Sequence, residues 1–514
     1  MSQSHMLLKG TFYLTAAGAV SRIAGFFYKI FLSRAIGAEE IGLFHLCMPV
    51  YAFGMAAASG GIQTAISRFT AQYTAKGQFR EARRILACAL ILSLSLALFC
   101  GALLYCAAGW IAEIFLAEPR CAPLLQIIAC SLPFCVVHTC VSGYFIGKKR
   151  AAIPAFSQLI EQCIRITAAV FFCSLFHHYE QLPKAAVMAL GQLAGETASC
   201  LFCMYFVLAG KRRQADAPGA GAFPSKRAFW LSGTRKLLQV SVPLGMNRML
   251  LCVLQAIEAA LLPQQLVLSG LSSSDALALY GTLSGMTLPL LLFPTAITGP
   301  VGMQLLPLIS EAQTLNQEDR VRATAKATFT GSLLLGLFFF SAFFLAGKEL
   351  GMLLFDSVPA GAYLQMLSLV CPFLYLNTTV INILHGIGKT SAASFYTSAG
   401  FLLRLASVIL LVPGQGMRGY FWGILAGQVL VTALSLWTLY RENALLLSVS
   451  DAFLKPALLC LLTIGSVSLL RQYLPFLLQA AWFPVFVNLL LCFAIFASLT
   501  ACGLLPRIRK SLRR

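Results

Sequence analysis

Long runs of apolar residues follow one another along almost the whole chain. Each run is close to the roughly 20 residues that a helix needs to cross a bilayer. The runs are continuous rather than alternating, which favours helices over the strands of a membrane barrel. The pattern predicts fourteen membrane helices, at residues 8–33, 43–70, 84–107, 120–146, 152–174, 186–208, 236–262, 277–308, 327–347, 361–386, 392–412, 417–439, 453–470 and 482–503.

Composition supports the same class. Apolar residues make up 59% of the chain and charged residues 11%, with a mean hydropathy of +0.80. Soluble domains carry about 25% charged residues. The first apolar run, at 8–33, is longer than the roughly 7–15 residues of a secretory signal, and it predicts a membrane helix rather than a removable leader. We therefore expect an all-α polytopic membrane protein.

The distribution of basic residues predicts the orientation in the membrane. Loops on the side of the N-terminus hold 26 of the 38 Lys and Arg residues, and loops on the other side hold 6. Because cytoplasmic loops are enriched in Lys and Arg, both termini are predicted to be cytoplasmic. The net charge of +20 follows mostly from this bias, so it does not indicate nucleic-acid binding.

Weak internal similarity predicts two pseudo-symmetric lobes. Ser21-Arg22 resembles Asn247-Arg248 at an offset of 226, and Pro133-Phe134 resembles Pro372-Phe373 at 239. Ile146-Gly147-Lys148 resembles Ile387-Gly388-Lys389 at an offset of 241. The predicted parts are an N-lobe of six helices (1–208), a basic cytoplasmic linker (209–235), a C-lobe of six helices (236–440), and two further helices with a basic cytoplasmic tail (441–514). Lobes repeated in this way are a common plan for transporters.

Charged residues within the predicted spans are the candidates for function. Six are cations, Arg22, Lys29, Arg68, Arg165, Arg248 and Arg404, and three are acids, Glu161, Glu196 and Glu258. A cation at bilayer depth costs about 3 kcal/mol on insertion scales. An excess of embedded cations over acids favours a site for an anionic substrate.

Two helices carry these groups as polar stripes. Thr15, Arg22 and Lys29 are seven residues apart and share a helix face. The seventh span repeats the spacing with Ser241, Arg248 and Gln255, and Glu258 lies near the same face. Arg and Lys at such positions suit phosphate or diphosphate, so the stripes predict a cationic, water-filled central cavity.

Structural roles compete with binding at the other charges. Arg68 lies near the cytoplasmic end of its span and either anchors it by snorkelling or binds substrate. Arg165 follows Glu161 by four residues, so an ion pair within the helix is the favoured role there. Arg404 either binds substrate or bonds to Glu196 on another helix.

Two spans contain helix-breaking residues that could serve as gates. The second carries Ser59-Gly60-Gly61, and the eighth carries Pro289, Pro294, Pro300 and Pro307. Small residues allow close packing, and proline kinks a helix. Gly and Pro are also common in membrane helices without such a role.

No metal site is predicted. The 17 cysteines lie almost entirely in apolar spans, where cysteine behaves as a small hydrophobic residue. Cys200 and Cys203 have metal-type spacing but lie in an apolar helix without further ligands, and the six histidines are scattered.

The N-terminal segment resembles a known family. The similarity lies in Ala19-Val20-Ser21-Arg22-Ile23-Ala24-Gly25 through Lys29, followed by Ser33-Arg34-Ala35-Ile36-Gly37-Ala38-Glu39 and Gly42-Leu43-Phe44. These residues are similar to the polysaccharide-transport branch of the multidrug/oligosaccharidyl-lipid/polysaccharide (MOP) flippase superfamily, and most of all to its stage V sporulation protein B group, which is related to lipid II flippases. Relatives often have Arg where this chain has Lys29.

The resemblance implies a flippase of the bacterial cell membrane. It would move an undecaprenyl-(pyro)phosphate-linked oligosaccharide or peptidoglycan precursor from the inner to the outer leaflet, by alternating access of the cationic cavity. Arg22, Lys29, Arg68 and Arg248 are at positions suited to line it. The implied partners are the lipid-linked sugar, the bilayer and enzymes of cell-wall or polysaccharide synthesis. No cofactor is expected, and coupling to Na⁺, protons or the membrane potential stays open.

Two other functions compete with the flippase. A cation-coupled multidrug exporter of the same superfamily would need embedded acids, of which this chain has fewer than cations. A membrane glycosyltransferase or polymerase would need catalytic groups on a large external loop. The longest predicted external loops, 175–185 and 347–361, contain no such cluster, so no enzyme activity is expected.

Overall fold

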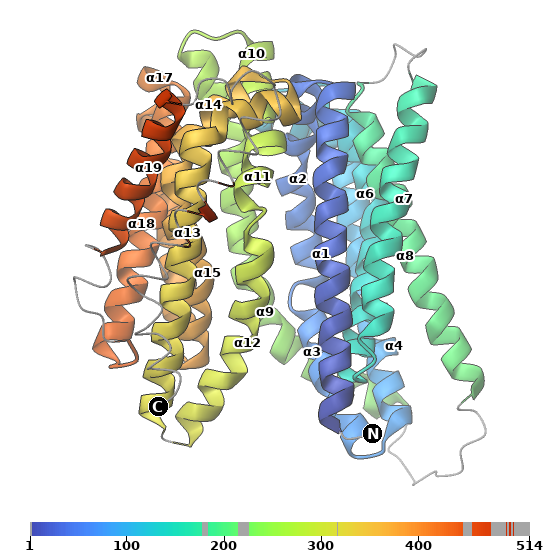
Figure 1. The fold of residues 1–514 in the computed structure, drawn as a ribbon. Coiled ribbons are helices and arrows are strands. Elements are labelled where there is room, and N and C mark those ends of the chain that lie inside the picture. The colour runs from blue at the N-terminus through green and yellow to red at the C-terminus, as the bar shows by residue number, and fades with distance from the viewer. Residues whose placement is uncertain are drawn as a thin grey trace. The chain divides into compact units, whose positions relative to one another are not determined.

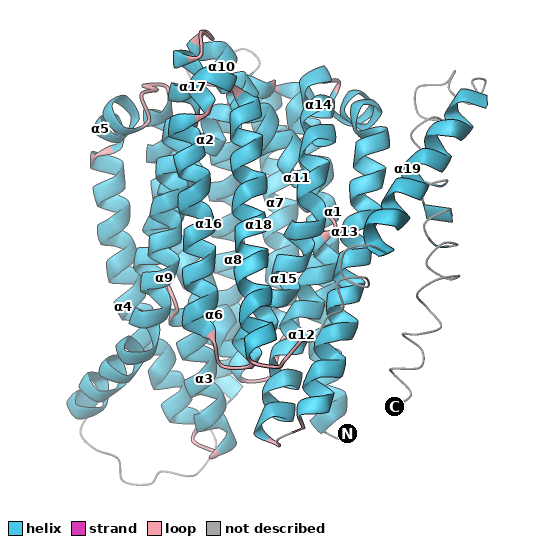
Figure 2. Cartoon of the chain, turned by 90° about the vertical axis from the view of Figure 1, so that its left-hand side faces the viewer, coloured by secondary structure: helices cyan, strands magenta, loops and turns pink. Residues whose placement is uncertain are grey.

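The computed structural model of the chain describes residues 3–176, 183–213, 226–315, 317–445 and 455–473, together with 490, 493, 494 and 497. Within these ranges every regular element is a helix, and the connections between helices are short loops (Figure 2). The predicted all-α class is therefore confirmed.

The chain divides into two compact units, Met1–Gln264 (unit 1) and Gln265–Arg514 (unit 2). The helices of unit 1 are α1 (Gln3–Ala35), α2 (Ala38–Ser59), α3 (Ile62–Ala75), α4 (Phe79–Cys106), α5 (Ala108–Trp110), α6 (Cys121–Gly147), α7 (Ala152–Phe176), α8 (Ala186–Arg213) and most of α9 (Lys226–Leu268). A π-helical turn, Ile111–Phe115, follows α5. In Figure 1, α1 runs beside α7, against which it packs.

Unit 2 contains the remaining helices. They are α10 (Ser273–Gly281), α11 (Leu288–Leu292), α12 (Thr295–Thr314), α13 (Glu318–Phe355), α14 (Val358–Leu367), α15 (Cys371–Gly386), α16 (Thr390–Leu410), α17 (Val412–Gln415), α18 (Met417–Arg441) and α19 (Lys455–Tyr473). A π-helical turn, Thr282–Thr287, joins α10 to α11, and a 3-10 turn, Ser368–Val370, joins α14 to α15.

Eleven helices of the described residues are long and apolar enough to cross a membrane, and they correspond to the second to twelfth predicted spans. The first span falls within α1, and the thirteenth overlaps α19 from Lys455 onward, whereas 482–503 lies almost entirely outside the described residues. A multi-span protein is confirmed, and the count of fourteen stays a prediction.

The predicted lobes and linker also stay predictions. The linker range, 209–235, is partly helical, because α8 extends to Arg213 and α9 begins at Lys226; residues 214–225 lie outside the described residues.

Each unit has its own apolar core. In unit 1 the core includes Ile66 of α3, Ile85 of α4, Val141 of α6 and Leu237 of α9, all fully buried. In unit 2 the core includes Val380 of α15 and Leu439 of α18. Because lipid tails are as apolar as these side chains, tight packing rather than exclusion of water holds such helices together.

The second predicted span breaks in the middle. α2 ends at Ser59, Gly61 has a φ of 77°, and α3 begins at Ile62. Only glycine adopts that left-handed conformation readily. The break lies against α9 of the same unit, where a Cβ on Gly61 would stand 2.6 Å from the Ser241 carbonyl oxygen. The sequence therefore predicted the position of a bend in the second span, and the structure shows that the helix is interrupted there completely.

The eighth predicted span is also interrupted. The π-helical turn Thr282–Thr287 precedes Pro289, and the helix stops again before Pro294, after which α12 begins at Thr295. Proline removes a backbone donor and clashes with the preceding turn, which accounts for the second interruption. The corresponding spans of the predicted lobes are therefore both broken.

Helix ends fix the register between the two halves of the sequence. After α6 the left-handed residue is Lys149, with a φ of 59°, and after α15 it is Gly388, with a φ of 81°. These two positions are 239 apart, as are Pro133 and Pro372. The offset of 241 taken from Ile146-Gly147-Lys148 is therefore wrong by two residues, because matching side chains there are not at matching backbone positions.

We expect Gly61→Ala to destabilise the protein more than Gly77→Ala does. Both glycines are left-handed, so both variants lose about 1–2 kcal/mol from backbone strain. Around Gly77 there is open space, whereas a Cβ at Gly61 would also press on α9. Thermal unfolding of the detergent-purified variants measures the difference. Equal losses of stability would show that α9 does not press on the break.

Candidate functional site

α1 has one face packed into unit 1 and another that carries cations. Ala17, Ser21, Tyr28 and Leu32 are buried in a stripe with helical spacing, and α1 packs against α7. A Cβ on Gly25, in the same stripe, would lie 3.3 Å from the Gln162 amide nitrogen. Arg22 lies off this stripe and is exposed, and Lys29 is half-buried. The side chain of Thr15 is outside the described residues.

The predicted stripe on α9 is divided between surface and interior. Arg248 is exposed and Gln255 is half-buried. Ser241 is buried, donates to the Leu237 carbonyl oxygen at 2.8 Å, and is covered by the break at Gly61. Glu258 is buried at 6% exposure. The predicted stripe is therefore not uniformly accessible, because neighbouring helices decide which of its members stay exposed.

Arg68 lies on α3 and is exposed. Arg22, Arg68 and Arg248 each make no hydrogen bond or ion pair with any described residue. The same holds for Lys29 and Gln255 within the described ranges. Among the embedded cations predicted from the sequence, three exposed guanidinium groups on three helices of unit 1 thus have no partner among the described residues. We call Arg22, Arg68 and Arg248 the exposed arginines.

Arg165, in contrast, belongs to a buried cluster. It forms an ion pair with Glu161 one turn earlier on α7, as the sequence predicted, and its Nη2 lies 3.9 Å from Oε1 of Glu196 on α8. His138 of α6 completes the group, with Nδ1 at 3.7 Å from a carboxylate oxygen of each glutamate. We call His138, Glu161, Arg165 and Glu196 the ionisable cluster.

Two glycines on α8 bring the cluster together. A Cβ on Gly195 would lie 2.8 Å from the Glu161 carbonyl oxygen, and one on Gly191 would lie 3.0 Å from that of Arg165. Their four-residue spacing is the small-residue pattern that lets membrane helices approach closely. Glu196 follows the second glycine directly, so the close approach of α8 to α7 places its carboxylate beside Arg165.

Hydrogen bonds fix the histidine and one glutamate. His138 bonds through Nε2 to Ser157 Oγ at 2.9 Å and through Nδ1 to Ser199 Oγ at 3.2 Å. Gln192 Nε2 donates to Glu196 Oε1 at 3.0 Å. Both imidazole nitrogens are therefore engaged, and the ring is held between the two carboxylates.

The cluster suits a single positive charge. With His138 neutral, two carboxylates and one guanidinium sum to a charge of −1. Ligand-type atoms of His138, Glu161 and Glu196 lie within 4.8 Å of one another, although the sequence predicted no metal site. The Arg165 guanidinium already holds Glu161, which opposes a divalent ion, and hard cations prefer oxygen to imidazole nitrogen.

The sequence reasoning missed His138 and the convergence around it. Histidine alone in an apolar span carries little signal. The stronger signal was the pair of glycines at 191 and 195 directly before Glu196, since it predicts a close helix contact at an embedded charge.

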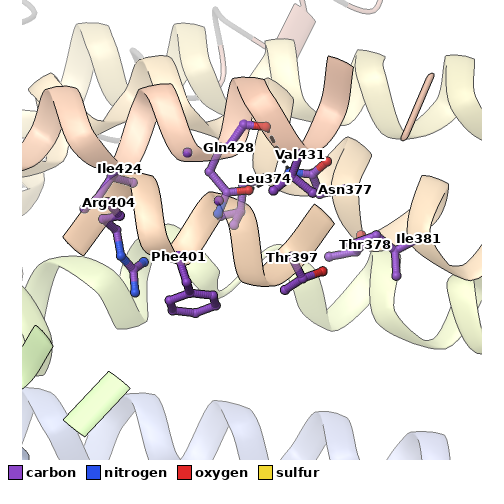
Figure 3. A pocket seen from close by; sticks show the side chains of 12 residues that line it. Leu374, Asn377, Thr378, Ile381, Thr397, Phe401, Arg404, Ile424, Gln428 and Val431 are labelled. Carbon is purple, nitrogen blue, oxygen red and sulfur yellow. Dashed lines mark hydrogen bonds between the residues drawn. The ribbon is translucent and has the colours of Figure 1, made fainter. Parts of the chain in front are cut away.

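Arg404 lies in unit 2, on α16. It is half-buried, and its Cζ stands 4.4 Å from the centre of the Phe401 ring. Both side chains line a cavity of about 200 Å³ between α15, α16 and α18 (Figure 3).

Comparisons with known proteins agree with this architecture. A family model described as "Polysaccharide biosynthesis protein" matches residues 7–313, more than half of the chain. Stage V sporulation protein B of Bacillus subtilis (strain 168) is 27% identical over 474 residues, covering 91% of this chain and 90% of that protein.

Two solved structures share the fold. The lipid II flippase MurJ in an inward closed conformation has a TM-score of 0.72 at 14% identity, over 98% of this chain and 99% of that one. An inward-facing multidrug resistance MATE family transporter of the MOP superfamily has a TM-score of 0.64 at 15% identity, over 83% and 98% of the two chains.

The family model and the sporulation protein agree with the predicted polysaccharide-transport branch. The two solved structures show that the fold is shared with a flippase and a transporter. The relative from Bacillus and the many apolar helices indicate a multi-span protein of a bacterial cell membrane. The chain belongs to the polysaccharide biosynthesis protein family.

Proposed function

We propose that this protein is a flippase for a sugar linked to undecaprenyl phosphate or diphosphate, either an oligosaccharide or a peptidoglycan precursor. It would carry the headgroup from the inner to the outer leaflet by alternating access of a cationic central cavity. Its family and its likeness in fold to a lipid II flippase support this transport class. The proposed orientation has both termini in the cytoplasm.

The exposed arginines are the observation that carries the proposal. Each lies on a helix predicted to cross the membrane, and none is neutralised by a described residue. A membrane protein retains such charges at a cost, so a function for them is the default inference. Three guanidinium groups supply paired N–H donors that match phosphate oxygens.

The other predicted cavity residues have supporting roles. Lys29 adds a point charge on α1, without the forked geometry of arginine. Gln255 can donate to sugar or phosphate oxygens. Glu258, which is buried, would tune the field around Arg248 rather than contact an anionic headgroup.

We further propose that protons drive the cycle through the ionisable cluster. Protonation of His138 changes the cluster from −1 to neutral, and the group is almost enclosed, with side chains 6–21% exposed. Tyr51 of α2 and Cys135 of α6 also face Glu196, and Tyr28 of α1 faces Arg165. A change of charge here would therefore reach α1, which carries Arg22 and Lys29.

The drug exporter remains the second candidate because one structural neighbour is a multidrug resistance transporter. The exposed arginines count against it, since a site for cationic drugs needs accessible acids. Drug resistance on overexpression that is lost in Glu258→Gln would favour the exporter. The glycosyltransferase is disfavoured by the transport class of the relatives.

We expect Arg22→Gln and Arg248→Gln each to slow flipping by about tenfold or more, because each removes hydrogen bonds to a charged group. The measurement follows a fluorescent undecaprenyl-diphosphate sugar between leaflets of proteoliposomes. Arg80→Gln, which removes an exposed charge at the start of α4, serves as the control and should flip normally.

Equal flipping by the intact protein and both variants would exclude the arginine site. No flipping by the intact protein with any headgroup, while drug efflux is measurable, would replace the flippase with the exporter.

We expect Glu196→Gln and His138→Asn to remove the response of flipping to an imposed pH gradient. In the intact protein the rate should rise with the gradient; the variants should flip at one slow rate in either direction. His385→Asn, which changes a half-buried histidine of unit 2, should keep the full response. A response to sodium instead of protons, lost in the same variants, would refute proton coupling at this cluster.

A further inference from the structure

Unit 2 contains a counterpart of the ionisable cluster. With the offset of 239, which the ends of α6 and α15 fix, His138 corresponds to Asn377 and Arg165 corresponds to Arg404. The hydrogen bonds that close both turns match at this offset, from Arg150 N to the Phe145 carbonyl oxygen and from Lys389 N to the Leu384 carbonyl oxygen, so the register continues into α7 and α16. Glu161 then corresponds to Gly400.

Glycine contacts give the register of the third helix independently. A Cβ on Gly195 would meet the Glu161 carbonyl oxygen at 2.8 Å, and one on Gly427 would meet that of Gly400 at 2.7 Å. A Cβ on Gly191 would lie 3.0 Å from the Arg165 carbonyl oxygen; one on Gly423 would lie 3.5 Å from that of Arg404, with the Ser407 side chain nearer. The residue after the second glycine is Glu196 in unit 1 and Gln428 in unit 2.

The ionisable cluster and its counterpart in unit 2 therefore differ in charge, although each contains an arginine at the corresponding position. In unit 1 the arginine lies between two carboxylates. In unit 2 the corresponding positions are a glycine and a carboxamide, and the histidine is replaced by Asn377. Among the described side chains that line the cavity of about 200 Å³, Arg404 is the one that carries a charge.

The polar groups of this cavity are arranged by hydrogen bonds. Asn377, which is 5% exposed, donates to the Gln428 side-chain oxygen at 2.6 Å and accepts from Thr432 Oγ1 at 2.9 Å. The Gln428 amide nitrogen donates to no described residue, so it is a donor available to a ligand. Figure 3 shows the bond between Asn377 and Gln428, and Arg404 beside Phe401.

Size and charge indicate the occupant. The cavity is smaller than the roughly 300–1,000 Å³ of pockets for drug-sized ligands, so it holds one unit of a larger substrate. One guanidinium matches one carboxylate in a bidentate pair, whereas a diphosphate carries more charge than a single arginine neutralises. Amides and the hydroxyls of Thr378 and Thr397 suit sugar hydroxyl groups.

We propose that the cavity lined by Arg404, Phe401, Asn377 and Gln428 is a headgroup subsite for a sugar that carries a carboxylate. The proposal rests on the proposed flippase and extends it from the class of lipid to the class of sugar. Arg404 binds the carboxylate, Gln428 donates to the same unit, and Phe401 holds the guanidinium in place through its ring.

The first test uses free sugars that differ in one group. Glucuronate and glucose share a ring and differ in a carboxylate against a hydroxymethyl group. Glucuronate should raise the unfolding temperature of the purified protein at concentrations where glucose does not. Arg404→Gln should abolish that rise, and Arg418→Gln, an exposed charge at the start of α18, should keep it. Stabilisation by inorganic phosphate or diphosphate alone would overturn the assignment to a sugar acid.

The second test uses transport. Intact protein in proteoliposomes should flip undecaprenyl-diphosphate-linked glucuronate about tenfold or more faster than the glucose lipid when both are subsaturating. Arg404→Gln should slow the glucuronate lipid far more than the glucose lipid, so that the preference between the two lipids is lost. Gln428→Glu introduces the carboxylate that Glu196 supplies at the corresponding position of unit 1, with little change in shape. It should also remove the preference for the glucuronate lipid.

The outcomes separate the two proposals. Equal flipping of both lipids by the intact protein would overturn the subsite and leave the flippase in place. If neither lipid is flipped, the flippase fails and the free-sugar titration decides the subsite alone: no difference between glucuronate and glucose would overturn it.

Discussion

Close backbone contact between glycine-bearing helices is the constraint on which the polar chemistry of this protein depends. Side chains in lipid gain little from burial against one another, so helices associate where their backbones can approach. Gly191 and Gly195 allow this approach of α8 to α7, and Gly423 and Gly427 allow it for α18 and α16. At both contacts the next side chain along the helix enters a polar site. A larger residue at any of these glycines would separate the pair and move that side chain away.

The second theme is how an embedded charge is neutralised. Unit 1 neutralises Arg165 internally, with the carboxylates of Glu161 and Glu196 beside His138. The exposed arginines of the same unit receive no such compensation from the described residues, so their counter-charge has to come from a ligand or from solvent. Unit 1 therefore contains both the ionisable cluster, whose charges largely balance one another, and the exposed arginines, whose charges do not. α1 lies beside the cluster through Tyr28 and also carries Arg22.

The sequence predicted the helical class, eleven of the spans, the ion pair of Arg165 with Glu161 and the bends in two spans. These follow from local patterns, since hydropathy, four-residue spacing and glycine or proline act within one helix. It did not predict that Glu196 and His138 join Arg165, because three helices separated by loops meet there. It also placed Ser241 and Arg248 on one face, but the burial of Ser241 depends on the break at Gly61 in a different helix.

The interruption at Gly60 and Gly61 has a mechanical consequence. An unbroken span moves as one rod, whereas α2 and α3 are two rods of 22 and 14 residues joined by two glycines. Arg68 is on the shorter rod and Tyr51, which faces the ionisable cluster, is on the longer. A force on Arg68 would tilt α3 alone, turning it about the point where α9 presses against the two glycines, and α2 with Tyr51 would stay in place.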